Sequence, residues 1–374
     1  MANMLDYLAW RGDLSLADSP INEVDALILA ELSYLNLDGI LTAEPGPQLS
    51  LRRAAERYAA RGNTQPPVIN DPRPLMKAAA ASRRFGGMKL GGYINLVDPE
   101  RQLQLAALSL FPEDGSVCAA FRGTDNTIVG WREDFNFCYQ EHTAGQAEAV
   151  AYLNRLAAST VGPIRVCGHS KGGNFAVYAA AFCDPAVRDE RICRVYAEDA
   201  PGFRRELAEA PEIRAVLAKT EVFIPESSLI VILLNTKKEK QIVRSDAGGL
   251  YQHNPFSWQV LGPRFEAADS RSVSSLLMDE TLNRWMDSLS DKERANFVQA
   301  VFGAMEKSGA LTLHEMKLDP VATAAAILGA VRQMDPELQK SAFATIGKLA
   351  AAGGGTLRDE LARLLRLRLP DSGQ

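Results

Sequence analysis

Short apolar runs separated by turn residues occupy the middle of the chain and predict strands. The first three runs cover residues 93–97, 103–111 and 116–121. Residues 112–115, Pro-Glu-Asp-Gly, join the last two runs, and this composition is typical of a tight turn between antiparallel strands. The sheet is therefore expected to begin with an antiparallel hairpin.

Beyond residue 140, segments with helical periodicity alternate with short apolar runs. Helices are predicted over residues 144–158, 174–183 and 204–219, and strands over 164–169, 193–197, 221–224, 229–234, 242–244 and 258–260. Strands separated by helices imply right-handed crossovers and a parallel sheet covered on both faces. The pattern predicts an α/β fold with a mostly parallel central sheet.

The two ends of the chain have different patterns. A helix is predicted over residues 19–41, with Ser19 as its cap and apolar residues recurring along one face. Residues 44–74 contain many prolines and an arginine-rich helical piece, which predicts a surface excursion. From Arg271 onward nearly every segment has helical spacing, including 322–334, 338–349 and 357–369. We expect one domain over residues 1–262 and a helical module over residues 263–374.

Composition narrows the classes of partner. The chain has 374 residues, a net charge of -5 and no basic stripe, which argues against binding to nucleic acid. No apolar stretch reaches the roughly 18 residues of a membrane span, and the first residues lack the pattern of a secretion signal. The five cysteines are odd in number and lack CxxC spacing, as expected for free thiols in a reducing compartment. A cytoplasmic location is expected.

The most informative stretch is Gly168-His169-Ser170-Lys171-Gly172, between a predicted strand and a predicted helix. A serine on such a turn leaves the strand's alternation, so its hydroxyl is exposed at the carboxyl edge of the sheet. The flanking glycines avoid collisions with neighbouring backbone. This context predicts the nucleophile elbow of an α/β-hydrolase, with Ser170 as the nucleophile.

A serine nucleophile needs a base, and the chain has only four histidines to supply it. His169 adjoins the serine and should diverge from it, His142 precedes the elbow, and His314 lies in a helical pattern. In this fold the histidine follows both nucleophile and acid along the chain. His253, in a loop after the last strands, is therefore the predicted base.

Two carboxylates compete for the role of the acid that orients the histidine. Asp199 follows the strand after the elbow and is favoured, because that strand end lies at the carboxyl edge of the sheet. Glu226, which ends the next strand, is the alternative, and an aspartate at a strand end can also simply cap the following helix.

Negative charge on the substrate oxygen requires preorganised donors. The backbone N–H of Lys171 is one predicted donor, and Thr124, in the turn Arg122-Gly123-Thr124-Asp125, is the second, through its N–H and its hydroxyl. No HExxH, Walker-type or GxGxxG motif occurs. Neither a metal nor a nucleotide cofactor is therefore expected.

Five sequence blocks in order carry a resemblance to a known family. They are NEVD with LSY near residues 22–34, FRGTD with GWREDFNF, GHSKGGN, the turn of residues 199–203, and QHNPFSW. The chain resembles the Mbeg1-like family of bacteria, related to the class 3 lipases, over roughly residues 20–262. The resemblance assigns Ser170 as nucleophile, His253 as base, and Lys171 and Thr124 as oxyanion donors.

These observations together predict a serine hydrolase that cleaves an ester or other acyl bond of a small or lipid-like substrate. Class 3 lipases usually carry their acid at the position of Glu226, so the acid stays open between that residue and Asp199. The alternative is a catalytically idle hydrolase fold that acts as a binding module. Substrate identity and oligomeric state do not follow from the sequence.

Overall fold

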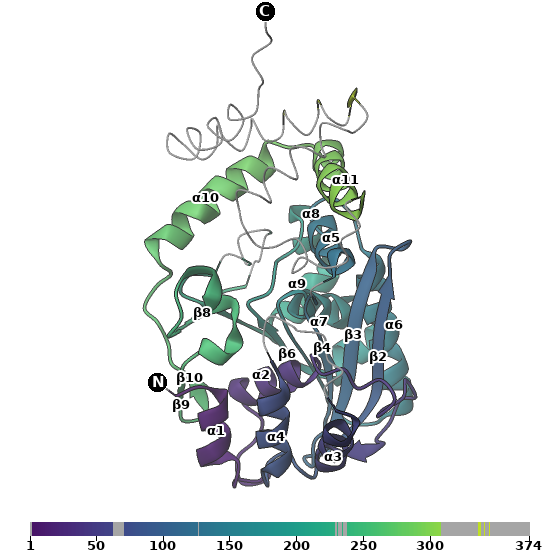
Figure 1. Cartoon of the computed structure of the whole chain (residues 1–374), viewed down its shortest axis with the longest axis vertical. Coiled ribbons are helices and arrows are strands. Elements are labelled where there is room, and N and C mark those ends of the chain that lie inside the picture. Colours follow the sequence, from purple (N-terminus) through teal and green to yellow (C-terminus); the bar gives the residue numbers. More distant parts are fainter. Residues whose placement is uncertain are drawn as a thin grey trace, which may run out of the picture.

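A single eight-stranded sheet forms the centre of the protein (Figure 1). The computed structural model describes residues 2–62, 71–125, 127–228, 230, 234, 238–307, 336, 337, 340 and 344. The strands follow one another in chain order across the sheet; β1 to β4 pair antiparallel, and β4 to β8 pair parallel. The predicted α/β fold with a mostly parallel sheet is confirmed.

The strands agree closely with the apolar runs of the sequence. Their bounds are β1 Leu49–Ser50, β2 Lys89–Asp98, β3 Leu103–Phe111, β4 Val117–Phe121, β5 Ile164–His169, β6 Ile192–Glu198, β7 Thr220–Pro225 and β8 Lys240–Val243. A separate small sheet pairs β9, Val260–Leu261, with β10, Arg264–Phe265. The predicted hairpin is β3–β4, in which Ala107 lies opposite Phe121. Most of the predicted strand 229–234 lies outside the described residues.

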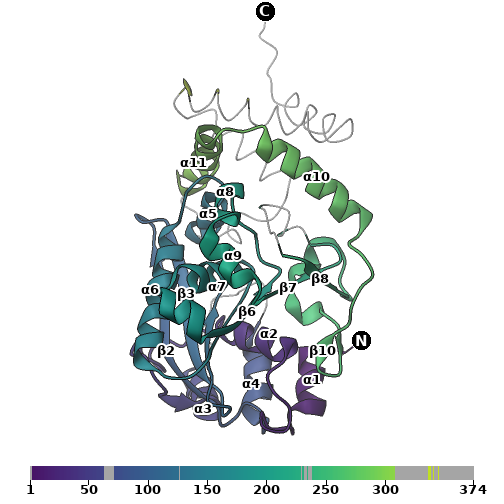
Figure 2. The same ribbon diagram turned by 180° about the vertical axis from the view of Figure 1, so that it is seen from behind.

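Helices cover both faces of the sheet, as predicted. Odd-numbered residues of β4 belong to an apolar core that includes residues of α6 (Ala144–Ser159), α7 (Lys171–Phe182) and α9 (Pro211–Leu217). Its even-numbered residues belong to a second core, with α1 (Met4–Arg11), α2 (Glu23–Leu32), α3 (Leu51–Arg61) and α4 (Arg73–Ala81). Figure 2 shows α1 to α4 together at one end of the molecule, far from α5 (Ile128–Asn136) and α11 (Asp291–Lys307).

The first 81 residues differ from the sequence prediction. The predicted helix 19–41 is shorter, because Asn22, not Ser19, caps it through bonds from the N–H groups of Val24 and Asp25. The helix ends at Leu32, and the following apolar residues continue in turns. The prediction of a surface excursion over 44–74 was wrong for α3, which buries Leu51, Ala54 and Tyr58, whereas residues 44 and 45 are exposed. Residues 63–70 lie outside the described part, and α4 begins at Arg73 and also buries one face.

Two further segments depart from or extend the prediction. The helix predicted over 204–219 is split into α8, Arg205–Ala208, and α9, because Pro211 cannot donate the backbone bond that would continue the first piece. Helices α10, Val273–Asp287, and α11, Asp291–Lys307, confirm the helical character beyond Arg271. The later predicted helices lie outside the described residues apart from positions 340 and 344. The domain boundary at residue 262 stays a prediction.

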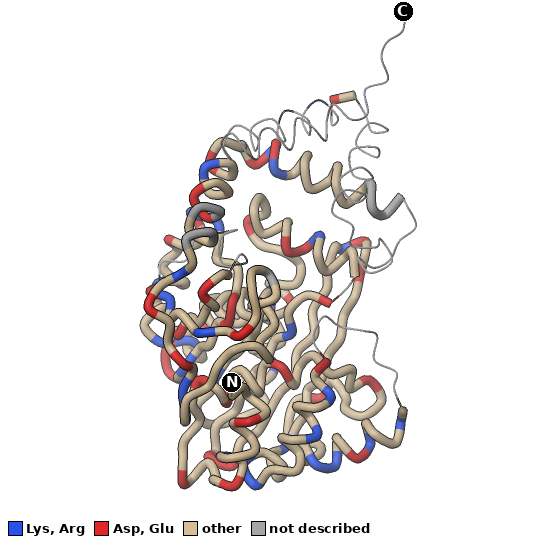
Figure 3. The backbone as a smooth tube through the Cα atoms, turned by 60° about the vertical axis from the view of Figure 1, so that its left-hand side comes forward, with Lys and Arg blue, Asp and Glu red and all other residues tan. Residues whose placement is uncertain are grey.

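Surface charge and thiols complete the picture of the described residues. Basic and acidic positions are interspersed along the backbone (Figure 3). All five cysteines are free, as expected; Cys118, Cys167 and Cys183 are buried, whereas Cys193 is exposed. Within the described part of the chain, no helix has both the length and the hydropathy to cross a bilayer.

Candidate active site

Ser170 lies at a sharp turn between β5 and α7. Its backbone has φ 59° and ψ -133°, a combination that costs a non-glycine residue about 1–3 kcal/mol. Two glycines allow the turn to pack. A Cβ at Gly172 would lie 2.1 Å from the carbonyl oxygen of Phe121, and one at Gly168 would lie 2.2 Å from that of Gly172. The predicted strand, turn and helix are therefore all present, and close packing holds the strained serine in place.

Two hydrogen bonds join Ser170 to residues far along the chain. Nε2 of His253 lies 3.0 Å from Ser170 Oγ, and Nδ1 of the same ring lies 2.7 Å from Oδ2 of Asp199. When Nδ1 carries the ring proton, it donates to the carboxylate and leaves Nε2 to accept from the serine hydroxyl. The histidine ends a short 3-10 helix, Gly249–His253, and Trp258 Nε1 donates to the carbonyl oxygen of Gln252 at 2.9 Å, which ties this loop to the core.

Asp199 is held firmly behind the histidine. Its side chain is fully buried, its backbone has φ 41°, and its N–H donates to the carbonyl oxygen of Phe223 at 2.7 Å. The carboxylate also accepts a hydrogen bond from the hydroxyl of Ser228. Glu226, the alternative acid, is half-buried on the turn after β7. The geometry therefore brings Asp199, not Glu226, to His253.

The loop that follows β4 passes close beside the serine. A Cβ at Gly123 would lie 2.9 Å from Ser170 Cβ, so only glycine fits this approach. Thr124 comes next, and its hydroxyl donates to Asp134 of α5. This bond engages the hydroxyl that was expected to serve the substrate, and the N–H of Thr124 stays a predicted oxyanion donor. Burial raises the pKa of Asp134 from 3.8 to about 6, against the opposing effect of nearby Lys171.

Lys171 contributes to the site in two ways. As the first residue of α7 its N–H lies in the turn that has no acceptor within the helix, as its predicted role as a donor requires. Its side chain is fully buried, and Nζ donates to Gln104 Oε1 at 2.6 Å and to the carbonyl oxygen of Gly130 at 3.2 Å, with Glu133 Oε2 at 3.4 Å. This network connects the elbow to α5.

The remaining histidines and two unpredicted residues complete the description. His169 points away from the serine toward Tyr34, and His142 is exposed; His314 lies outside the described residues.

Sequence reasoning missed Ser228 and Tyr34 as parts of this region. Ser228 could have been found because it lies at the strand end that carries Glu226, the alternative acid. Tyr34 could have been found because it lies in the LSY block that supports the family resemblance. Among described residues no cluster of three or more metal-ligating side chains occurs.

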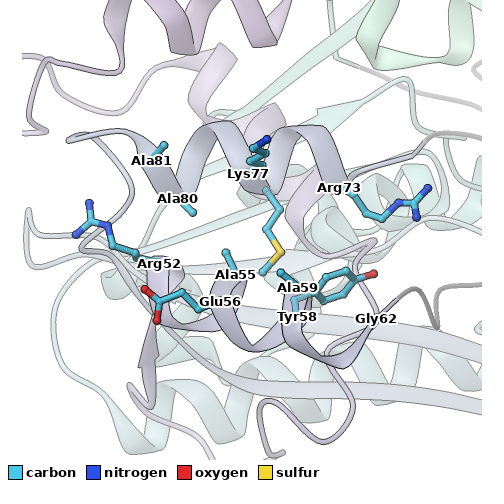
Figure 4. Close-up of a pocket in the computed structure, with 11 residues that line it drawn as sticks. Arg52, Ala55, Glu56, Tyr58, Ala59, Gly62, Arg73, Lys77, Ala80 and Ala81 are labelled. Atoms are coloured by element: carbon cyan, nitrogen blue, oxygen red, sulfur yellow. The ribbon is translucent and has the colours of Figure 1, made fainter.

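Two concave surfaces lie away from the three hydrogen-bonded residues. A groove of about 590 Å³ runs between α3 and α4, with Met76 and small side chains along it and Arg52, Arg73 and Lys77 around it (Figure 4). A second, apolar pocket lies between α5, α10 and α11; Asp134 lines it together with Trp285 of α10. Only the second adjoins the loop of Thr124, because Asp134 bonds to that residue.

The chain shows similarity to known proteins at the levels of sequence and fold. The sequence profile of the Mbeg1-like family matches residues 79–303, more than half of the chain and beyond the boundary predicted at 262. No curated protein matches. The fold is similar to that of M37 lipase, at 13% identity over 56% of this chain and 69% of that chain, with a TM-score of 0.38.

The native Rhizomucor miehei lipase propeptide complex is a further solved structure with a similar fold. It is 14% identical over 59% of this chain and 67% of that chain, with a TM-score of 0.35. A deletion mutant of the same complex is also 14% identical, over 68% of this chain and 76% of that chain, with a TM-score of 0.37. The match of the family profile to more than half of the sequence establishes that this chain belongs to the Mbeg1-like family.

Proposed function

We propose that the protein is a serine hydrolase that cleaves an ester or another acyl bond through an acyl-enzyme on Ser170. The observation that carries this proposal is the pair of hydrogen bonds from Ser170 Oγ to His253 and from His253 to Asp199, at 3.0 and 2.7 Å. This arrangement of hydroxyl, imidazole and carboxylate activates a hydroxyl whose own pKa is too high for attack at neutral pH.

The reaction would take place in two balanced halves. His253 Nε2 takes the proton of Ser170 as Oγ forms a bond to the acyl carbon, and the N–H groups of Lys171 and Thr124 would stabilise the resulting oxyanion. The bond to the leaving alcohol then breaks, and that oxygen receives the proton from His253. Water repeats the sequence, releases the acid and restores the serine. Asp199 keeps the imidazole in the required tautomer throughout.

The pocket between α5, α10 and α11 supports a substrate with an apolar acyl part. Its lining includes Leu282, Trp285, Phe297 and Val298, and it adjoins the loop of Thr124 through Asp134. The cavity measures about 40 Å³, which is room for no more than a small apolar group of the substrate. The role of α10 and α11 in this proposal is to form the apolar wall of the substrate site.

Labelling with a fluorophosphonate tests the proposal directly. We expect the folded protein to become labelled at Ser170, and to turn over p-nitrophenyl butyrate. Ser170→Ala and His253→Ala should each lower kcat by about 10⁴-fold or more. Ser159→Ala and His142→Ala change exposed residues and are the matched controls. A folded protein that ignores the probe, or that labels equally after Ser170→Ala, would instead favour a binding module.

The assignment of the acid has a separate test. Asp199→Asn should lower kcat by up to about 10⁴-fold, because an amide cannot hold the tautomer that accepts the serine proton. Glu226→Gln is the control on the next strand end, and we expect less than a threefold change, well under 1 kcal/mol of barrier. Steady-state kinetics on both variants compare the two carboxylates, and a larger loss in Glu226→Gln would reverse the assignment.

A further inference from the structure

The ring of His169 lies directly against the ring of His253. The two ring centroids are 4.6 Å apart with an interplanar angle of 29°, which is a stacked arrangement. Trp258 meets His169 edge-on at 6.3 Å and 80°. Because Ser170 has a positive φ, its side chain and that of His169 leave the chain in different directions. His169 thus supports one face of the imidazole that bonds to the serine.

His169 is itself fixed from the side of α2. Its Nδ1 lies 3.2 Å from Tyr34 Oη and 3.4 Å from Glu31 Oε1. The Tyr34 hydroxyl also accepts a hydrogen bond from the N–H of Gly123 at 3.1 Å. One phenol therefore contacts both the ring beneath His253 and the loop that precedes Thr124. The last turn of α2 and the residues after it link the base to the predicted oxyanion loop.

The ionisable groups around the His169 ring are buried, and burial favours their neutral forms. His169 is 1% exposed, and Glu31 and Glu198 are fully buried. Burial lowers the pKa of His169 well below its usual value, with a further contribution from His253. Burial raises the pKa of Glu31 to about 8, and raises that of Glu198 well above its usual range with help from Glu31. A neutral His169 can stack on His253 without repelling the imidazolium that forms there.

We propose that His169 is a positioning residue for His253: its ring, hydrogen-bonded to Tyr34 and stacked on His253, sets the orientation in which Nε2 reaches Ser170 Oγ. The inference rests on the proposed function and adds a residue to it. The ring touches neither substrate nor serine, so it acts through the base alone. The observation behind the inference is the stacking of the His169 ring on the ring of His253.

The full-length protein with His169→Ala and with His169→Phe provides the test. We expect His169→Ala to lower kcat for p-nitrophenyl butyrate by roughly 10- to 100-fold with KM within about threefold, since misplaced catalytic groups lose rate rather than binding. His169→Phe retains a planar ring and should keep kcat within about threefold of the wild type. Rates are normalised to the sites titrated by fluorophosphonate, and circular dichroism checks the fold. His142→Ala serves as the exposed control.

The outcomes separate this inference from the proposed function. A wild-type protein without turnover or labelling rejects the function itself, and the inference with it. An active wild type with an equally active, folded His169→Ala rejects only the role of His169. The proposal would also be overturned if kcat fell as far in His169→Phe as in His169→Ala, because a planar ring at this position would then not be enough to position His253. Should His169→Ala fail to fold, His169→Leu replaces it: this variant keeps apolar bulk but has no planar ring, and unchanged kcat would contradict the proposal.

Discussion

Two buried polar networks flank Ser170, and they differ in how many hydrogen bonds their ionisable groups make. On the side of α5, the Lys171 ammonium has Gln104, Gly130 and Glu133 as partners. Glu133 in turn accepts from the N–H groups of Gln104 and Gly145, at 2.8 and 2.7 Å. On the side of α2, both oxygens of Glu31 and of Glu198 lack hydrogen-bond partners among the described residues. The Lys171 network is ionic and richly hydrogen-bonded, although Nε2 of Gln104 has no partner among the described residues, whereas the network on the side of α2 is sparsely bonded.

The difference follows from what burial costs in each case. A buried ion pair is tolerated when each charge has its full set of hydrogen bonds, as Lys171 and Glu133 do. A buried carboxyl without such bonds is stable only with its proton, and the raised pKa values of Glu31 and Glu198 agree with this. As a result the region beneath His253 lacks the charges that would compete with Asp199. The ionic network lies instead where it can fix the elbow to α5.

The largest effect is expected from breaking the ionic network. Lys171→Met leaves Glu133 as an unpaired buried charge, and we expect the free energy of unfolding to fall by about 3–5 kcal/mol. The double variant Lys171→Met, Glu133→Gln removes that charge and should recover part of the loss. Urea unfolding curves measure both.

Lys77→Met is the matched control for this experiment, because Lys77 is an exposed lysine on α4. It should change the free energy of unfolding by less than about 0.5 kcal/mol. If Lys171→Met lowered the free energy of unfolding no more than Lys77→Met does, the Lys171–Glu133 pair would add no stability. The contrast between this pair and the network of Glu31 and Glu198 would then be lost.

The sequence predicted the parts of the molecule that local patterns determine. The strands from β3 to β7 have continuous apolar runs, and the elbow is set by glycines within five residues of Ser170. His253 and Asp199 were also predicted as partners of Ser170, because few histidines compete and the fold fixes the order of the residues along the chain; their roles stay predictions. Helix α3 was underestimated, because its arginines mask the spacing of Leu51, Ala54 and Tyr58, the residues that it buries.

The two polar networks were beyond the reach of the sequence patterns. Lys171 and Glu133 are 38 positions apart, and His169 and Tyr34 are 135 apart, so only the packing of α5 and α2 brings them together. A partial signal existed at Glu31, a single acidic residue within the apolar run of α2, all of whose last turn is buried. A buried glutamate is either paired with a hydrogen-bond or ionic partner or protonated, and only the three-dimensional structure shows which of these applies.

A smaller effect, confined to a pH range, is expected from Glu31→Gln. In the folded protein the pKa of Glu31 is raised from 4.5 to about 8, so between these values the native state holds a proton that the unfolded chain releases. Its contribution to stability is therefore fully present below about pH 4.5 and is lost as pH rises toward 8, by at most about 1.4 kcal/mol per pH unit. Glu31→Gln cannot titrate and should lack this part of the slope.

Unfolding free energies measured from pH 4.5 to 8 on the wild type and on Glu31→Gln show this contribution, together with the change that the loss of Glu31 causes in the titration of Glu198. Glu44→Gln, a change at an exposed residue, is the control and should follow the wild-type curve. Parallel curves for the wild type and Glu31→Gln would mean that Glu31 is ionised in the native protein at neutral pH. The region beneath His253 would then carry a charge, and the contrast with the Lys171 network would be lost.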